Sequence, residues 1–202
     1  MAQLNHGHAL AVYSAVMNAH ISAVSATIEQ LFLRSGDVSY GESVTQREHA
    51  LQSALLAQEA GAAHALILAA LLHDVGHMLH PDAALALAHA QDDSHEQIGA
   101  VWLSQFFGPS VTEPVNLHVQ AKRYLCWADP DYYDGLSDVS KKSLALQGGV
   151  FSEADAQVFL QRPYARDAIS LRKWDEQAKA PKAPTPDLDH FMQSIRHCLE
   201  GV

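Results

Sequence analysis

Apolar residues recur every three or four positions along most of this chain, and no stretch alternates between apolar and polar positions as a half-buried strand would. This spacing is typical of one face of an α-helix. It predicts helices over residues 24–36, 45–61, 63–77, 94–108, 113–128, 139–149, 152–163, 164–180 and 187–201. The chain has 202 residues and no internal repeat, which suits one main domain. We therefore expect an all-α, single-domain helical bundle.

Local sequence signals set several of the helix ends. Thr45 with Glu48, and Ser94 with Gln97, have the spacing of a capping box, in which two side chains bond to each other's backbone N–H groups. Pro114 suits the first turn of a helix, where the N–H that proline lacks is not needed. Three segments rich in turn-forming residues are expected to be loops or joints: 36–43, 129–138 and 180–188.

The helix predicted over residues 63–77 is apolar around most of its circumference, which indicates a buried central helix. It is expected to end by Pro81. Its last turns nevertheless contain His73, Asp74 and His77. A polar group buried without a partner costs roughly 2–7 kcal/mol, so these side chains need partners from other helices.

Histidine is the unusual feature of the composition, since the 13 histidines equal the lysines and arginines together. Histidine is the commonest metal ligand and the usual base near neutral pH, so this excess favours a metalloenzyme. The formal net charge of −10 disfavours nucleic acid and anionic membranes as partners. Cys126 and Cys198 are far apart and have the spacing of neither a disulfide framework nor a thiolate metal site.

The chain contains no segment of the roughly 20 apolar residues that a membrane span needs. No lysine or arginine precedes Arg34, so the charged start of a secretory signal is missing. These features predict a cytoplasmic protein.

Six potential ligands follow the order H…HD…H…H…D on different predicted helices: His49, His73, Asp74, His95, His118 and Asp175. A metal centre in a bundle needs such ligands to converge from several helices. Imidazole and carboxylate together suit iron, manganese or zinc, and the residue types alone do not choose among these metals.

Longer stretches around these ligands carry a family resemblance. The segments QREHALQSALLAQEAGA, LHDVGH, HVQAKRYLCWADPDYYDGLSDVS, LALQGG and LRKWDEQAK resemble the mixed-valent di-iron oxygenases of the HD superfamily. Those enzymes cleave the carbon–phosphorus bond of 1-hydroxyphosphonates and are related to myo-inositol oxygenase. The resemblance implies an HD-domain bundle over residues 23–180. Residues 1–22 would form an N-terminal extension, and residues 181–202 a proline-rich joint with a C-terminal helix.

The resemblance also implies cofactors and their ligands. The protein would bind two iron ions as a mixed-valent Fe(II)/Fe(III) pair and use O2 as co-substrate. One iron would be held by a first set of residues, His49, His73, Asp74 and Asp175. The second iron would share Asp74, as a bridge, and be held also by His95 and His118.

For the substrate, the resemblance implies an anion-binding end. Lys122, Ser140 and Arg172 match positions that hold the phosphonate, and His77 matches a further histidine near the substrate. Lys122 lies one helical turn after His118, so both are expected to face the same cavity.

The loop before His49 would then serve the other end of the substrate. Glu42 matches an acid that meets the substrate amine. Tyr40, displaced by one residue from the usual spacing, matches a tyrosine that occupies the open iron position until substrate arrives. A primary ammonium suits Glu42, whereas a quaternary ammonium is also held by aromatic faces such as those of Tyr40, Tyr132 and Tyr133.

The activity implied by the resemblance is O2-dependent cleavage of a 1-hydroxy-2-(amino or trimethylamino)ethylphosphonate to glycine or glycine betaine plus phosphate. The main alternative is a metal-dependent HD phosphohydrolase that acts on nucleotides or phosphomonoesters. A third possibility is a catalytically idle HD protein that serves as a binding module. The sequence leaves the amine type and the oligomeric state open.

Overall fold

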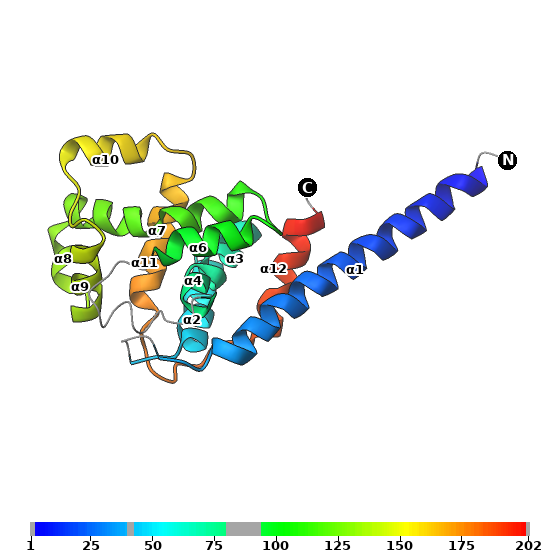
Figure 1. The fold of residues 1–202 in the computed structure, drawn as a ribbon, viewed down its shortest axis with the longest axis horizontal. Coiled ribbons are helices and arrows are strands. Elements are labelled where there is room, and N and C mark those ends of the chain that lie inside the picture. Colours follow the sequence, from blue (N-terminus) through cyan, green and yellow to red (C-terminus); the bar gives the residue numbers. More distant parts are fainter. Residues whose placement is uncertain (1–2, 40–42, 80–93, 201–202) are drawn as a thin grey trace.

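The computed structural model describes residues 3–39, 43–79 and 94–200, and every regular element in these ranges is a helix. Their one strand-like feature is an isolated antiparallel bridge between Ser39 and Thr45. Within the same ranges, no helix is both long and apolar enough to cross a membrane. The prediction of an all-α, single-domain bundle is confirmed (Figure 1).

The first half of the bundle contains α1 (Gln3–Ser35), α2 (Gln46–Glu59), α3 (His64–Leu72), α4 (Val75–Leu79) and α6 (His95–Leu103). The second half contains α7 (Pro109–Ala128), α8 (Pro130–Gly135), α9 (Asp138–Leu146), α10 (Glu153–Leu160), α11 (Ala165–Gln177) and α12 (Leu188–Glu200).

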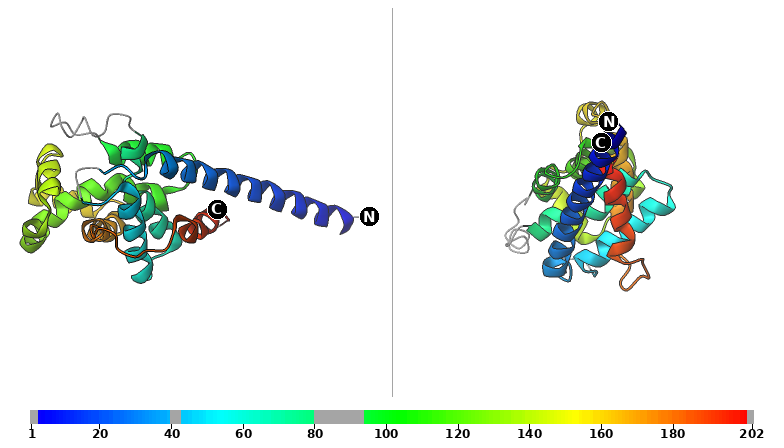
Figure 2. Two further views of the ribbon diagram at one scale, coloured as in Figure 1. Left: turned by 90° about the horizontal axis from the view of Figure 1, so that it is seen from below. Right: turned by 90° about the vertical axis from the view of Figure 1, so that its right-hand side faces the viewer.

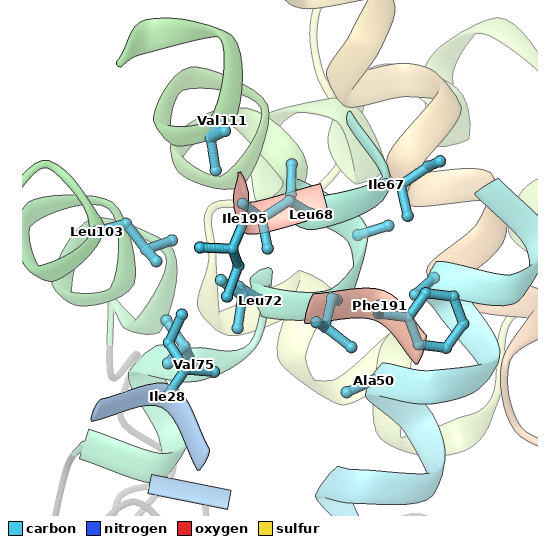
Figure 3. Close-up of a cluster of buried hydrophobic side chains, with 14 of the residues drawn as sticks. Ile28, Ala50, Ile67, Leu68, Leu72, Val75, Leu103, Val111, Phe191 and Ile195 are labelled. Atoms are coloured by element: carbon cyan, nitrogen blue, oxygen red, sulfur yellow. The ribbon is translucent and has the colours of Figure 1, made fainter. Parts of the chain in front are cut away.

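The short helix α3 lies at the centre of the core. It packs against α2, α7, α11 and α12. Leu68 and Leu72 are completely buried, and Figure 3 shows them surrounded by side chains of neighbouring helices, among them Leu103, Val111 and Ile195. Full burial of one such side chain contributes about 1.5–3 kcal/mol, so this cluster stabilises the part of the bundle in which the His-Asp pair lies.

The long helix α1 is packed along only part of its length. Ile21, Val24 and Ile28 are buried in the main core, whereas Val12 and Tyr13 are exposed. Figures 1 and 2 show the N-terminal half projecting away from the bundle. The helix is continuous across residues 22 and 23, between which the resemblance placed the start of the HD-domain bundle.

The helix predicted over residues 63–77 is in fact two helices. α3 ends at Leu72 and α4 begins at Val75, so His73 and Asp74 form a turn between them. The apolar periodicity continues through the turn, which explains the wrong prediction. His73 itself keeps helical backbone angles (φ −62°, ψ −36°), so the interruption is short.

Of the two predicted capping boxes, one is confirmed. The Thr45 hydroxyl accepts from the backbone N–H of Glu48, whose carboxylate accepts from the backbone N–H of Thr45. The prediction for Ser94 and Gln97 was wrong: Ser94 has a left-handed backbone (φ 50°) and its side chain caps no backbone group. A capping box needs an extended N-cap residue, so this φ excludes it.

Two boundaries in the second half also differ from prediction. α7 begins at Pro109, which takes the early position expected for Pro114, and Pro114 lies inside the helix. Residues 129–138 are not wholly a loop, because α8 forms there. The Asp129 carboxylate caps α8 by accepting from the backbone N–H groups of Asp131 and Tyr132.

Candidate metal centre

The structure brings the six predicted ligands together from five places in the fold. His49 is in the first turn of α2, His73 and Asp74 form the turn after α3, and His95 opens α6. His118 lies in the middle of α7 and Asp175 near the end of α11. Residues more than 120 positions apart in sequence thus meet in one buried cluster, which no local structural preference requires.

One side of the cluster joins α2, the turn and α11. The Nε2 atom of His49 lies 3.1 Å from Nε2 of His73, 3.3 Å from Oδ1 of Asp175 and 3.6 Å from Oδ2 of Asp74. All of these side chains except that of Asp74 are at most 10 % exposed. This is a compact set of nitrogen and oxygen atoms that could hold one cation.

The other side of the cluster joins the turn, α6 and α7. The Nε2 atoms of His95 and His118 are 3.1 Å apart, and they lie 3.5 Å and 3.7 Å from Oδ1 of Asp74. These three residues form a second group able to hold a cation. Asp74 belongs to both groups, so the arrangement provides two adjacent positions with one shared carboxylate.

The orientation of the imidazoles fits metal binding. Nδ1 of His49, His73 and His118 each lies 2.7–2.9 Å from a backbone carbonyl oxygen. A carbonyl only accepts, so each Nδ1 carries the proton and each Nε2 can present a lone pair to the cluster. With Nδ1 bonded to a carbonyl, the 3.1 Å approach of the His49 and His73 Nε2 atoms requires either a proton on one ring or a cation bound to both.

The pKa shifts of Asp74 and His118 in the metal-free protein also favour metal binding. Burial raises the pKa of Asp74, but the surrounding imidazoles of His73, His77 and others outweigh burial and hold this pKa well below its usual range. Burial, with His95 and His73 nearby, lowers the pKa of His118. The shared aspartate is therefore ionised and His118 is neutral, which are the forms that bind metals.

A glycine allows this convergence. A Cβ at Gly76 would lie 2.0 Å from the backbone carbonyl oxygen of His95, far inside van der Waals contact. Only glycine lets α4 approach the start of α6 so closely. His77, one residue later, stacks on His95 with ring centroids 3.9 Å apart, so it lies beside the second group of ligands.

The three residues predicted to bind phosphonate lie on elements next to this cluster. Lys122 and Arg172 are only 4 % and 5 % exposed, so they are not the solvated surface residues that their type favours. Lys122 donates a 2.9 Å hydrogen bond to Ser143, while Arg172 contacts Asp175 and donates a 2.8 Å bond to Tyr132.

Burial and the nearby charge of Arg172 lower the pKa of Lys122 to about 7. Burial lowers the pKa of Arg172 too, but the charge of Asp175 outweighs it and raises this pKa. An anion bound beside both groups would favour the charged form of Lys122.

Ser140, the third predicted residue, donates a 3.2 Å hydrogen bond to Glu176. Tyr40 and Glu42 lie outside the described residues.

Sequence reasoning missed two residues of this region, Glu176 and Lys179. Glu176 contacts Arg172, and Lys179 donates to both Glu176 and Ser140. The signal was present, because Glu176 follows Asp175 directly and stands four residues after Arg172, on the same face of a helix. The backbone of Ala178 was also missed, although its carbonyl orients His49.

Comparisons with known proteins identify the family of this chain. The HD domain model matches residues 47–142. The hydroxymethylphosphonate dioxygenase of Gimesia maris is 46 % identical over 174 residues, which cover 85 % of this chain and 86 % of that protein. The 1-hydroxy-2-(trimethylamino)ethylphosphonate dioxygenase (glycine-betaine-forming) of Leisingera caerulea is 39 % identical over 171 residues, covering 84 % and 87 %.

A helical bundle with a His/Asp cluster at the break of its central helix defines an HD-domain protein with a metal-binding site. More narrowly, this chain belongs to the HD-domain family that includes these phosphonate dioxygenases.

Proposed function

We propose that this protein is a di-iron oxygenase that uses O2 to cleave the carbon–phosphorus bond of a small 1-hydroxyphosphonate. The observation that carries the proposal is the position of Asp74, which lies 3.5–3.7 Å from four imidazoles and belongs to two groups of ligands. A hydrolase with one metal has no use for the second group. The names of the two relatives support the same class of reaction.

In this proposal the chain holds two irons. His49, His73, Asp74 and Asp175 would hold one, and Asp74, His95 and His118 the other. When bound, the mixed-valent iron pair supplies the redox chemistry with O2, which amino-acid side chains do not provide. The helices contribute fixed ligand positions, because the Nδ1 contacts of His49, His73 and His118 orient each ring.

Lys122, Arg172 and Ser140 would bind and orient the phosphonate group. A guanidinium binds two oxygens of such a group at once, and a buried ammonium adds a second charge. Because the chain has a formal net charge of −10, a dianion needs these local cations to overcome the overall repulsion. His77, stacked on His95, would contact the substrate beside the second iron.

The expected reaction converts one 1-hydroxyphosphonate and one O2 into a carboxylic acid and inorganic phosphate. The carbon–phosphorus bond breaks, the carbon is oxidised, and both oxygen atoms of O2 enter the products. For a 1-hydroxy-2-(amino or trimethylamino)ethylphosphonate the acid is glycine or glycine betaine, and Glu42 would meet the amine.

Hydroxymethylphosphonate is a second candidate substrate, favoured by the 46 % identity to a relative named for it. It has no amine, so Glu42 would have no partner in it. The same stoichiometry yields formic acid and phosphate.

The test is phosphate release by the iron-loaded protein from all three hydroxyphosphonates, with and without O2. We expect release only with O2, accompanied by one equivalent of O2 consumed. The compound that is cleaved most efficiently shows which substituent on C1 this protein accepts.

Two other outcomes would contradict the proposal. Phosphate release from nucleotides or phosphomonoesters without O2 would identify a hydrolase, in which the metal activates water. A protein that retains no iron and turns over none of these compounds would be an idle binding module.

A further inference from the structure

The carboxylate of Glu176 collects hydrogen-bond donors from three segments of the chain. On its own helix, Arg172 contacts Oε2. After the helix, Lys179 donates to Oε1 at 2.9 Å. From the start of α9, the Ser140 hydroxyl donates to Oε2 at 3.2 Å and the Ser137 backbone N–H to Oε1 at 3.4 Å. Each carboxylate oxygen thus accepts from two donors.

Lys179 extends this network to the serines. Its ammonium group donates to the hydroxyls of Ser140 at 3.0 Å and Ser137 at 3.3 Å. Lys179 therefore reaches the same serine that the proposed function assigns to the phosphonate. Its side chain is 16 % exposed, so it is partly withdrawn from solvent, unlike Lys173 on the outer face of α11.

Fold stability alone does not account for Glu176. Its side chain is only 14 % exposed, and a largely buried ion pair often stabilises a fold no more than apolar residues of similar volume. What the carboxylate provides instead is geometry. It links α11 to α9 beside the buried cations Lys122 and Arg172, so it determines where the donors of this end lie.

We propose that Glu176 is a positioning residue of the anion-binding end, where it holds Arg172, Ser140 and Lys179 in the arrangement that receives the phosphonate group. The inference rests on the proposed function. The negative charge of Glu176 by itself repels a dianion, so its removal would strengthen binding if charge alone mattered. If placement of the donors matters more, its removal weakens binding.

The first test measures binding of methylphosphonate, which lacks the reacting hydroxyl, to iron-loaded protein by calorimetry. We expect Glu176→Gln to weaken binding on the order of tenfold or more, because the amide accepts at only one of its two positions. Glu59→Gln, at the exposed end of α2, removes the same charge and is the matched control. Affinity of Glu176→Gln equal to or higher than that of Glu59→Gln would overturn the proposal.

A purely structural role predicts a different pattern, so iron content and turnover are measured as well. We expect Glu176→Gln to keep its iron, to raise KM more than it lowers kcat, and to be partly rescued in Glu176→Asp. Loss of iron, or equal damage in both variants, would show that Glu176 only supports Asp175 and the helix.

Lys179 gives an independent check should Glu176→Gln fail to fold. Lys179→Ala should weaken methylphosphonate binding, whereas Lys173→Ala, on the exposed face of the same segment, should not. Equal affinities in these two variants would show that Lys179 does not contribute to the anion-binding end.

Failure of this inference is distinguishable from failure of the proposed function. If the wild-type protein cleaves no hydroxyphosphonate with O2, the proposed function is wrong, and the binding data still show whether Glu176 organises an anion site. If it does cleave one and Glu176→Gln binds methylphosphonate normally, only the inference is wrong.

Discussion

Asp74 has a side chain that is 20 % exposed and lies within 3.7 Å of imidazole nitrogens from α2, the turn after α3, α6 and α7. Its carboxylate is the one group common to both candidate cation positions. Asp175, in contrast, lies near the imidazoles of His49 and His73, on one side of the cluster. Asp74 is therefore a candidate ligand for both cations and Asp175 for one. Replacing each aspartate in turn tests this difference.

Asp74→Asn should lose both irons, because the shared anionic ligand disappears, whereas Asp175→Asn should lose one. Metal analysis of the purified proteins measures this directly. Asp134→Asn, on the exposed part of α8, is the charge-matched control and should keep the wild-type iron content. Equal iron content in Asp74→Asn and Asp134→Asn would show that Asp74 is no ligand.

His49 should give the centre a characteristic pH dependence. Burial lowers its pKa, but Asp175, with help from Asp74, outweighs burial and raises this pKa to about 9 in the protein alone. A raised pKa means that the bound proton stabilises the metal-free fold below the unfolded pKa of about 6.5, and that this contribution is lost as pH rises through about 9. The same proton competes with a metal for Nε2.

We therefore expect the affinity for Mn(II) to rise between pH 6.5 and 8.5. The free energy of unfolding of the metal-free protein should change less, because Lys122, whose pKa is lowered to about 7, contributes in the opposite direction above pH 7. Denaturant titration and Mn(II) titration at several pH values measure the two effects. The lowered pKa values of Asp74 and Asp175 act only in acid, below their unfolded values near 4, so they leave this window unchanged. A flat Mn(II) affinity would contradict the prediction.

At the scale of elements, the sequence predicted where most helices lie but did not predict the turn at His73 and Asp74. Apolar spacing located most of the helices but not α8 or the first half of α1, and the capping pair of Thr45 and Glu48 located the start of α2. Periodicity could not reveal the break between α3 and α4, because the apolar pattern runs through it and His73 keeps helical backbone angles (φ −62°, ψ −36°).

The candidate site divides in the same way. The order of histidines and aspartates revealed which residues converge, because ligand types at helical positions are visible in sequence. Glu176 was missed although it stands four residues after Arg172, because its contacts with Ser137 and Ser140 form only when the start of α9 reaches the end of α11.

Gly76 tests the role of this helix junction. Gly76→Ala places a Cβ 2.0 Å from the His95 carbonyl oxygen, so α4 and α6 must move apart. We expect a loss of roughly 1–3 kcal/mol in the free energy of unfolding and weaker metal binding on the His95 side. Gly135→Ala, where an added Cβ meets nothing within 4 Å, is the control and should be nearly neutral. Denaturant titration of both variants measures the loss of stability, and their iron content measures the loss of metal binding.

At the scale of the whole molecule, the two ends of the chain contribute differently, although the family resemblance is weak at both. Phe191 and Ile195 of α12 are at most 1 % exposed and belong to the main core. Figure 3 shows both beside the central helix α3. At the other end, residues 11–16 of α1 are exposed, and packing becomes substantial only near Ile21.

A chain without residues 1–16 should therefore fold and unfold with nearly the full stability, since the deletion removes no residue known to be buried. Deleting residues 187–202 instead uncovers α3 and removes Phe191 and Ile195. Loss of one large core side chain typically costs about 2–5 kcal/mol, so loss of both should exceed half of a typical domain stability. Thermal and denaturant unfolding of the two truncated proteins measures the contrast. If the C-terminal deletion is as stable as the N-terminal one, the core does not depend on α12, and the segment 23–180 implied by the resemblance is a self-sufficient domain.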